Sequence, residues 1–188
     1  MSPITEAIQV EHYRKLVREM MLAQKGKEYE FDSEWVSRHG WKVVPVESAM
    51  RLDKDEIPTL VSALKGAGYT RCVAVVTEAG YTQPVGPDNA LLGNSPTCYL
   101  LSIEEADFQE FNRELGPFRS VLTDEGRSWA ISCNEWYNLF GGRPDLLEAL
   151  LGEPIEQARQ EFFEFASSMA KGDPEEPLMQ VAERYAAL

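Results

Sequence analysis

The stretch that decides the fold runs from Gly116 to Gly142 and reads GPFRSVLTDEGRSWAISCNEWYNLFGG. Two short segments, 118–123 and 128–134, flank the tetrapeptide Asp124-Glu125-Gly126-Arg127, whose length and glycine are typical of a β-hairpin loop. We therefore predict two antiparallel strands. Successive side chains of a strand point to opposite faces. Trp129, Ile131 and Cys133 therefore share one face of the second strand, and Ala130 and Ser132 share the other. We expect Trp129 to lie in the core.

A concentration of aromatic residues follows the second strand and is closed by two glycines: Trp136, Tyr137, Phe140, Gly141 and Gly142. We predict a turn over 135–142 that exposes Trp136 and Tyr137, because connecting segments run over the surface. Tyr and Trp are enriched at the energetic centres of protein interfaces, which makes this pair a candidate binding surface. The alternative is a satellite core in which these rings pack beneath the helix that follows.

Helical and extended patterns alternate along the rest of the chain. Apolar spacing predicts helices over 2–25, 55–66, 102–115, 144–151, 155–169 and 178–185, and strands over 41–47, 71–77 and 97–103. Pro45 indicates that the strand 41–47 lies at a sheet edge, and the nearly continuous apolar run 71–77 indicates a central strand. Three helix starts are predicted from capping residues: Ser2 with Pro3, Asp55, and Ser102 with Glu105.

These elements predict one α+β domain over 1–171, with a mixed or antiparallel sheet of about five strands covered by helices and a helical C-terminal part. A chain of 188 residues is long enough for one well-filled core. We expect residues 172–188 to form a linker and a short, loosely docked C-terminal helix.

Charge is the most informative feature of the composition. The chain has 18 basic and 31 acidic residues, a net charge of −13. Up to position 100 it has 11 basic and 13 acidic residues, and after that position 7 and 18. A field of this sign repels phosphate backbones and anionic lipid, so we expect no nucleic-acid and no membrane partner, and we expect a basic protein partner. The alternative is that the charge only maintains solubility.

Cellular location is predicted from the N-terminus and the cysteines. The first residues lack the basic and then apolar blocks of a secretion signal, and no apolar run is long enough to cross a bilayer. Cys72, Cys98 and Cys133 each fall within a predicted strand, which favours reduced, buried thiols over a disulfide framework. We expect a cytoplasmic protein.

The sequence shows no motif for metal, cofactor or nucleophilic chemistry. Its two histidines, His12 and His39, are 27 positions apart in different elements, and Cys-x-x-Cys, His-Glu-x-x-His and Gly-x-Ser-x-Gly are all missing. We predict no catalytic residue, no metal site and no cofactor, which favours a protein that is not an enzyme. Cys133 paired with a histidine is the alternative nucleophile, but its predicted burial favours an inert thiol.

The helix 102–115 supplies the acidic part of the predicted partner-binding surface. Phe108, Phe111 and Leu115 share one side of this helix and should be buried. Four carboxylates should then remain in solvent and, with Trp136 and Tyr137, face the partner: Glu105, Asp107, Glu110 and Glu114.

Two other functions remain open. The long segment 78–96 is a candidate ligand loop through Tyr81, Gln83, Asp88 and Asn89, since connections of this length are often functional. A small-molecule-binding protein or hydrolase-like enzyme would have its site between this loop and the turn 135–142. A self-associating subunit would use Phe163 and the last helix.

A resemblance adds to these expectations. Thr123-Asp124, then Trp129 in a strand, then Phe140-Gly141 resembles a pattern of small acidic bacterial α/β proteins, of which many are uncharacterised and some are immunity proteins that neutralise toxins. The resemblance implies an acidic, non-enzymatic inhibitor of a basic toxin domain. It carries no catalytic residue over to this chain, and a shared fold does not establish a function.

Overall fold

The computed structural model describes residues 1–23, 29–48, 51–79, 98–115, 118–171 and 176–186. The strands are β1 (Ser2–Pro3), β2 (Met21–Ala23), β3 (Tyr29–Phe31), β4 (Lys42–Glu47), β5 (Arg71–Ala79), β6 (Cys98–Ser102), β7 (Phe118–Thr123), β8 (Trp129–Cys133) and β9 (Tyr137–Gly142). The helices are α1 (Ala7–Met20), α2 (Ser33–Arg38), α3 (Glu56–Gly66), α5 (Glu105–Leu115), α6 (Pro144–Leu151), α7 (Ile155–Ala170) and α8 (Pro177–Ala186).

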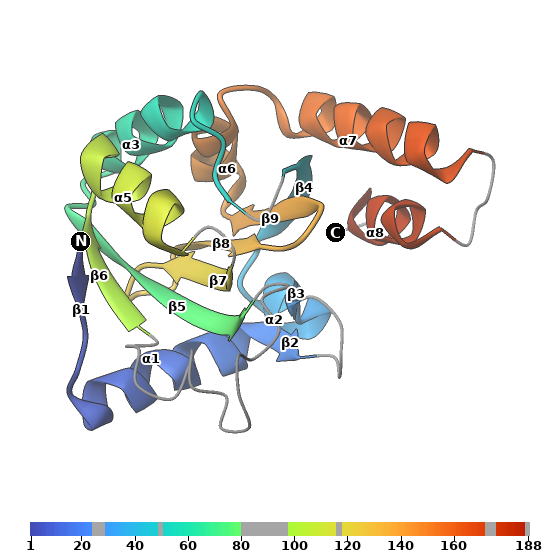
Figure 1. Ribbon diagram of the computed structural model, residues 1–188. Helices are drawn as coiled ribbons and strands as arrows, with labels where there is room; N and C mark the ends of the chain where they lie inside the picture. Colours follow the sequence, from blue (N-terminus) through green and yellow to red (C-terminus); the bar gives the residue numbers. More distant parts are fainter. Residues whose placement is uncertain (24–28, 49–50, 80–97, 116–117, 172–175, 187–188) are drawn as a thin grey trace.

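One sheet organises the molecule (Figure 1). It has seven strands in the order β1-β6-β5-β7-β8-β9-β4, and every pairing in it is antiparallel. A separate ribbon, β2–β3, has two strands. The predicted α+β class is confirmed, with more strands than the five expected. The predicted positions of β5 in the interior of the sheet and of β4 at an edge are also confirmed.

The hairpin β7–β8 has the predicted form. The Asp124 carboxylate closes its loop by accepting hydrogen bonds from the backbone N–H of Gly126 at 2.9 Å and of Ser128 at 2.6 Å. This is the side chain-to-backbone bonding that makes Asp common in turns. Arg127 supplies the left-handed residue of the loop, with φ 55°.

The sheet has a core on each of its faces. Trp129, Ile131 and Cys133 point toward α3, α5 and α6, while Ala130 points toward α1, α2 and α8. Helix α7 contributes to both cores, because its first turns lie on one and its later turns on the other. Trp129 is 0% exposed, so its predicted core position is confirmed. Burial on both faces also explains why β8 and β9 lack polar residues at every second position.

The prediction of a turn over 135–142 is wrong for residues 137–142, which form the strand β9. β9 lies between β8 and β4, and all of its residues are buried. A Cβ atom at Gly141 would lie 2.8 Å from Cζ of Phe31 and 3.1 Å from Cε3 of Trp41. The glycine is therefore a packing requirement within a strand, where two rings lie directly on the backbone.

The N-terminus also differs from the prediction of one helix over 2–25. Ser2 and Pro3 pair with Leu100 and Tyr99 as the edge strand β1, a position that tolerates proline. Helix α1 begins at Ala7 after Glu6, whose side chain makes no capping hydrogen bond.

The other two predicted caps form with different partners. Asp55 makes no side-chain cap bond; the carboxylate of Glu56 instead accepts the N–H of Asp53 at 2.9 Å. Asp107, and not Glu105, accepts the N–H of Ser102 at 2.7 Å. Glu56 and Asp107 thus accept the backbone N–H groups at these helix starts, one and two positions away from the predicted Asp55 and Glu105.

The edge strand β4 is covered by the C-terminal helices. Arg159 on α7 donates from Nη2 to the carbonyl oxygen of Val43 at 3.2 Å, which caps an edge acceptor that another chain would otherwise pair with. Helix α8 packs on α7 and β4. The ring of Tyr185 is fully buried there, and its hydroxyl accepts the N–H of Phe31 at 3.3 Å.

The three cysteines are buried and free, as predicted. None of the helices in the described ranges has the length and apolar character that a bilayer crossing requires.

Candidate functional site

The connection between β8 and β9 presents one exposed indole on a buried frame. Trp136 is 53% exposed, whereas Asn134 and Tyr137 on either side of it are 0% and 2% exposed. The predicted exposure of Trp136 is therefore confirmed. The predicted exposure of Tyr137 is wrong. Its ring packs edge-on against Phe162 with the centroids 5.9 Å apart, so it belongs to the core.

Backbone and charge contacts hold this turn in place. The N–H of Asn134 donates to the carbonyl of Tyr137 at 3.1 Å, and the N–H of Ser48 donates to the carbonyl of Trp136 at 3.2 Å. Arg119 and Glu135 form a largely buried ion pair at 3.6 Å. Sequence reasoning missed these supports, because the proximity of Arg119 and Glu135 follows only from the register of the strands.

Two asparagine side chains, one on β9 beside the turn and one on α5, bind the segment 51–52. Asn138 donates to the carbonyl of Arg51 at 3.0 Å, and Asn112 on α5 donates to the carbonyl of Leu52 at 2.6 Å. The hydroxyl of Ser48 also donates to the carbonyl of Arg51. The segment 51–52 therefore connects the Trp136 turn with α5 and with the start of α3.

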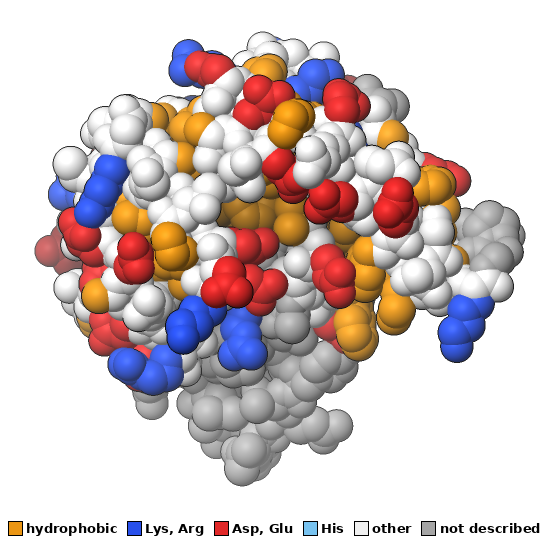
Figure 2. Space-filling view, turned by 90° about the horizontal axis from the view of Figure 1, so that it is seen from above, with side chains coloured by type: hydrophobic (Ala, Val, Ile, Leu, Met, Phe, Trp, Pro, Cys, Tyr) orange, Lys and Arg blue, Asp and Glu red, His pale blue; other side chains and the backbone are white. Residues whose placement is uncertain are grey.

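The helices of this layer are strongly acidic. Helices α3, α5, α6 and α7 together have ten acidic and three basic residues, whereas α1 has two acidic and three basic residues. Each of the three basic residues is paired with a carboxylate: Lys65 with Glu104, Arg113 with Glu114, and Arg159 with Glu156. Figure 2 looks onto this side and shows acidic side chains around a hollow floored by hydrophobic ones. These four helices thus carry −7 of the chain's net charge of −13.

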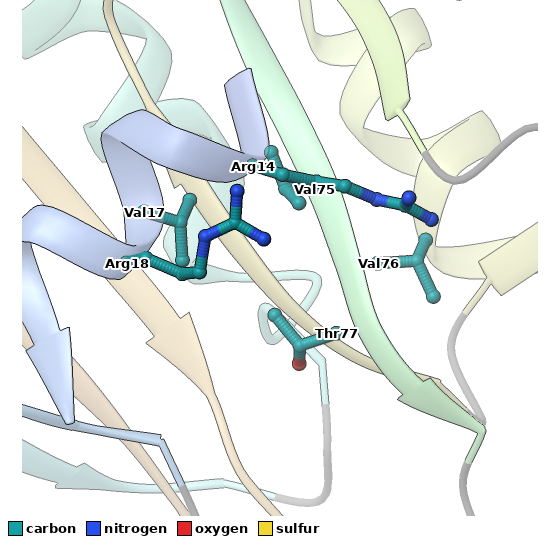
Figure 3. A pocket seen from close by; sticks show the side chains of 6 residues that line it. All are labelled: Arg14, Val17, Arg18, Val75, Val76 and Thr77. Carbon is teal, nitrogen blue, oxygen red and sulfur yellow. The ribbon is translucent and has the colours of Figure 1, made fainter. Parts of the chain in front are cut away.

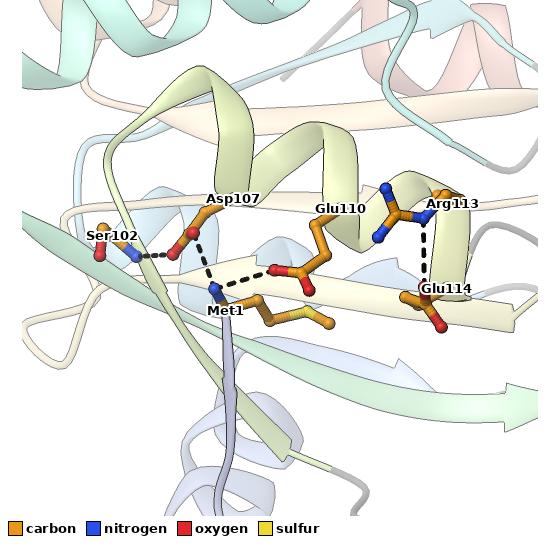
Figure 4. A network of polar contacts seen from close by, with 6 residues as sticks. All are labelled: Met1, Ser102, Asp107, Glu110, Arg113 and Glu114. Carbon is orange, nitrogen blue, oxygen red and sulfur yellow. Dashed lines mark hydrogen bonds and ion pairs between the residues drawn. The ribbon is translucent and has the colours of Figure 1, made fainter.

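The four predicted carboxylates of α5 are not equally available. Asp107 and Glu110 contact the α-amino group of Met1 at 2.7 Å and 3.1 Å (Figure 4). Glu114 pairs with Arg113 at 3.1 Å, and Glu105 is exposed. The expectation that all four remain in solvent is wrong for Asp107, whose side chain is 20% exposed, and holds only in part for Glu110 at 39%, because β1 brings Met1 beside α5.

The Met1 contact changes the protonation of both partners. Burial alone would raise the pKa of Asp107, but hydrogen bonds from the Met1 ammonium and from Ser102 outweigh it and leave this pKa below its usual value. The hydrogen bond to Asp107 raises the pKa of the α-amino group, against the opposing effect of burial. Both changes favour the charged pair.

Some predicted positions cannot be placed. Tyr81, Gln83, Asp88 and Asn89 of the candidate ligand loop lie outside the described residues. The side chain of Leu115 is likewise outside the described part. Phe108 and Phe111 are buried as predicted.

A row of polar side chains crosses the sheet beneath the segment 51–56. Ser120, Cys133 and Asn138 are register partners on adjacent strands, and all three are buried. Burial raises the pKa of Cys133 to about 12, and a hydrogen bond with Ser120 only partly opposes this effect. A thiol with this pKa stays protonated at neutral pH, so Cys133 lacks the thiolate that a nucleophile needs.

No group of three His, Cys, Asp or Glu side chains within the described ranges is arranged to hold an ion.

Phe163, the residue expected to mediate self-association, is 43% exposed and lines a hollow of about 210 Å³ with Pro45 and Ala182.

Comparisons with known proteins give no relative. No protein-family model matches the chain, and neither the curated proteins nor the solved structures contain a significant match.

Proposed function

We propose that the protein binds a basic protein partner through the Trp136 turn and the acidic face formed by α3, α5, α6 and α7. The observation that carries the proposal is the exposed indole on a turn whose neighbours are buried. The turn is connected to the acidic layer through Arg51 and Leu52. An aromatic anchor beside a surface of one charge is a common arrangement at protein interfaces.

The turn has the rigidity that a binding anchor needs. An indole offers a large contact area with few rotatable bonds, and a pre-ordered frame lowers the conformational entropy lost on binding. Hydrogen bonds from Ser48 and within the turn fix the backbone on both sides of Trp136. The ring therefore needs little ordering before it enters a pocket of the partner.

The charge of the face would act mainly on association. Exposed carboxylates contribute little to folding stability, but a surface of one sign raises the rate at which an oppositely charged partner arrives. Because no lysine or arginine on these four helices lacks a carboxylate partner, the negative field is not interrupted by free cations. The partner is accordingly expected to have a net positive surface.

The most concrete form of this proposal is an immunity-type inhibitor that covers a basic toxin domain. What supports it is the acidic face together with the resemblance of the segment 123–141. The proposal of protein binding does not depend on this form, and a basic partner of another kind would satisfy it equally.

The experiment uses a partner captured by the full chain from a lysate of its native source and then purified. Dissociation of the wild-type complex is compared with that of Trp136→Ala and of a matched control, Ile8→Ala, which also removes an exposed hydrophobic side chain. An interface hot spot contributes about 2 kcal/mol, so Trp136→Ala should dissociate roughly 30-fold faster, and Ile8→Ala at the wild-type rate. Equal dissociation of all three would show that Trp136 is not an anchor.

A further inference from the structure

A second hollow lies on the opposite side of the sheet, between α1 and β5. It has a volume of about 230 Å³ and is lined by Arg14, Val17, Arg18, Val75, Val76 and Thr77. Figure 3 shows the Arg14 side chain reaching across β5 toward Val76, whereas the Arg18 side chain ends between α1 and β5. None of the described residues that line this α1–β5 pocket belongs to the acidic face or to the Trp136 turn.

The charge of the pocket is opposite to that of the molecule. The chain has a net charge of −13, yet the lining residues that the structure describes include two arginines and no carboxylate. Arg18 pairs with Glu11 on the exposed side of α1, and both side chains are more than half exposed. Arg14 makes no ion pair with any of the described residues. A guanidinium offers several N–H donors in a planar fork that fits a carboxylate or phosphate group.

The floor of the pocket is apolar and fixed. Val17 and Val75 are nearly fully buried, and they belong to the core between α1 and the sheet. The hydroxyl of Thr77 donates to the carbonyl of Arg119 at 3.1 Å, which holds its side chain in place. Arginine donors at the rim and valines on the floor favour a ligand that has a charged end and an apolar body.

The backbone of β5 is irregular at this place. The register between β5 and β7 shifts between Val76 and Glu78, so Thr77 is an extra residue without a partner on β7. Such β-bulges redirect side chains and occur often beside functional sites. Here the bulge falls at Thr77, one of the residues that line the pocket.

We propose that the α1–β5 pocket binds a small organic anion, whose carboxylate or phosphate group pairs with Arg14 and Arg18 while its short apolar part lies on the valines. The volume of the pocket is below the roughly 300 Å³ at which sites for drug-sized ligands begin, so the ligand is small. None of the described lining residues belongs to the proposed protein interface, so the pocket can be tested separately from it.

The test titrates the full chain with hexanoate, hexanol and inorganic phosphate and follows binding by calorimetry and by backbone amide shifts of α1 and β5. Hexanoate should bind more tightly than hexanol, because hexanol lacks the charged end. Binding of hexanoate without phosphate identifies a carboxylate ligand, and binding of phosphate identifies a phosphate-bearing one. Both results support an anion site, whereas the absence of binding by either anion at 10 mM, a concentration on the order of weak fragment affinities, overturns it.

Two double variants with the same change in net charge separate the pocket from general electrostatics. Arg14→Gln with Arg18→Gln removes both rim cations, and Lys15→Gln with Arg38→Gln removes two cations outside the lining. The first pair should weaken anion binding about tenfold or more, and the second pair should leave it unchanged. Thermal unfolding of both variants confirms that they fold. Equal effects of the two pairs overturn the proposal, because binding would then follow net charge and not the pocket.

Discussion

Replacing Trp129 separates the contribution of its volume from that of its indole N–H. The side chain is fully buried on the face covered by α3, α5 and α6, and it contacts Tyr69 edge-on with ring centroids 6.3 Å apart. Deleting a buried large aromatic side chain costs about 3–5 kcal/mol, because transfer free energy is lost and a cavity remains. We therefore expect Trp129→Ala to lower the free energy of unfolding by that amount.

Trp129→Phe should behave differently. The Nε1 atom of Trp129 is buried and has no hydrogen-bond partner among the described residues. An unsatisfied buried donor costs about 1–3 kcal/mol, and phenylalanine removes it while keeping most of the ring. This gain offsets the smaller loss of packing, so the net destabilisation should be below about 1.5 kcal/mol.

The assay is urea unfolding, with the midpoint and slope measured for each variant. Trp136→Ala is the matched control: the same residue type is 53% exposed there, and its loss should cost less than about 1 kcal/mol. Equal, small losses for Trp129→Ala and Trp136→Ala would show that the inner face of the hairpin is wrongly assigned. A loss for Trp129→Phe as large as for Trp129→Ala would refute the reasoning about the unpaired N–H.

Three further predictions concern glycines, a carboxylate and the thiols. Gly141→Ala should lower the free energy of unfolding in urea by about 1–3 kcal/mol, because its Cβ would lie 2.8 Å from the ring of Phe31. Gly66→Ala has nothing within 4 Å of the added Cβ and should raise the free energy of unfolding by about 0.4–1 kcal/mol. The reverse order would contradict the packing at β9. Burial raises the pKa of Glu56, so the protonated carboxyl is favoured in the folded state. The stability that this group contributes is therefore full below the usual pKa of a glutamate and is lost as pH rises through the raised value. Glu56→Gln should remove this dependence, and unchanged pH profiles would argue against it. Cys72 and Cys133 should react with a thiol reagent only as fast as the protein unfolds, and rapid labelling in the native state would contradict their burial.

The hairpin and its surroundings were predictable because local patterns agree there. Two short segments rich in apolar residues, 118–123 and 128–134, and a four-residue loop with an aspartate and a glycine specify the same strand–turn–strand geometry. The helices α3, α6 and α7 were likewise predictable, because each has a clear apolar stripe and a proline or glycine at an end. Errors arose where two structures fit one pattern. Ser2-Pro3 suits a helix start and an edge strand equally, and only its pairing with β6 decides between them.

The candidate site was predictable only in part. Trp136 and Tyr137 are adjacent and similar, and their different exposure follows from where β9 begins. Because β9 is buried on both faces, its sequence shows no alternation that would have identified it as a strand. The loss of Asp107 and Glu110 from the free acidic surface depends on Met1, which lies more than a hundred positions away in the chain. Contacts of this separation are set by topology and leave no local signal.

Association with the captured partner at two salt concentrations tests the proposed function most directly. The test variant reverses three exposed carboxylates of the acidic face, Glu105→Lys, Glu161→Lys and Glu164→Lys. A control variant makes the same change in net charge on other elements: Glu6→Lys, Glu34→Lys and Glu183→Lys.

Exposed charges are screened over about 10 Å at 0.1 M ionic strength, so steering by the face should weaken as salt is added. We predict that the test variant associates at least about tenfold more slowly than the control variant at low salt, and that the difference shrinks at high salt. Equal association rates of the two variants at both salt concentrations would contradict the claim that the acidic face directs binding.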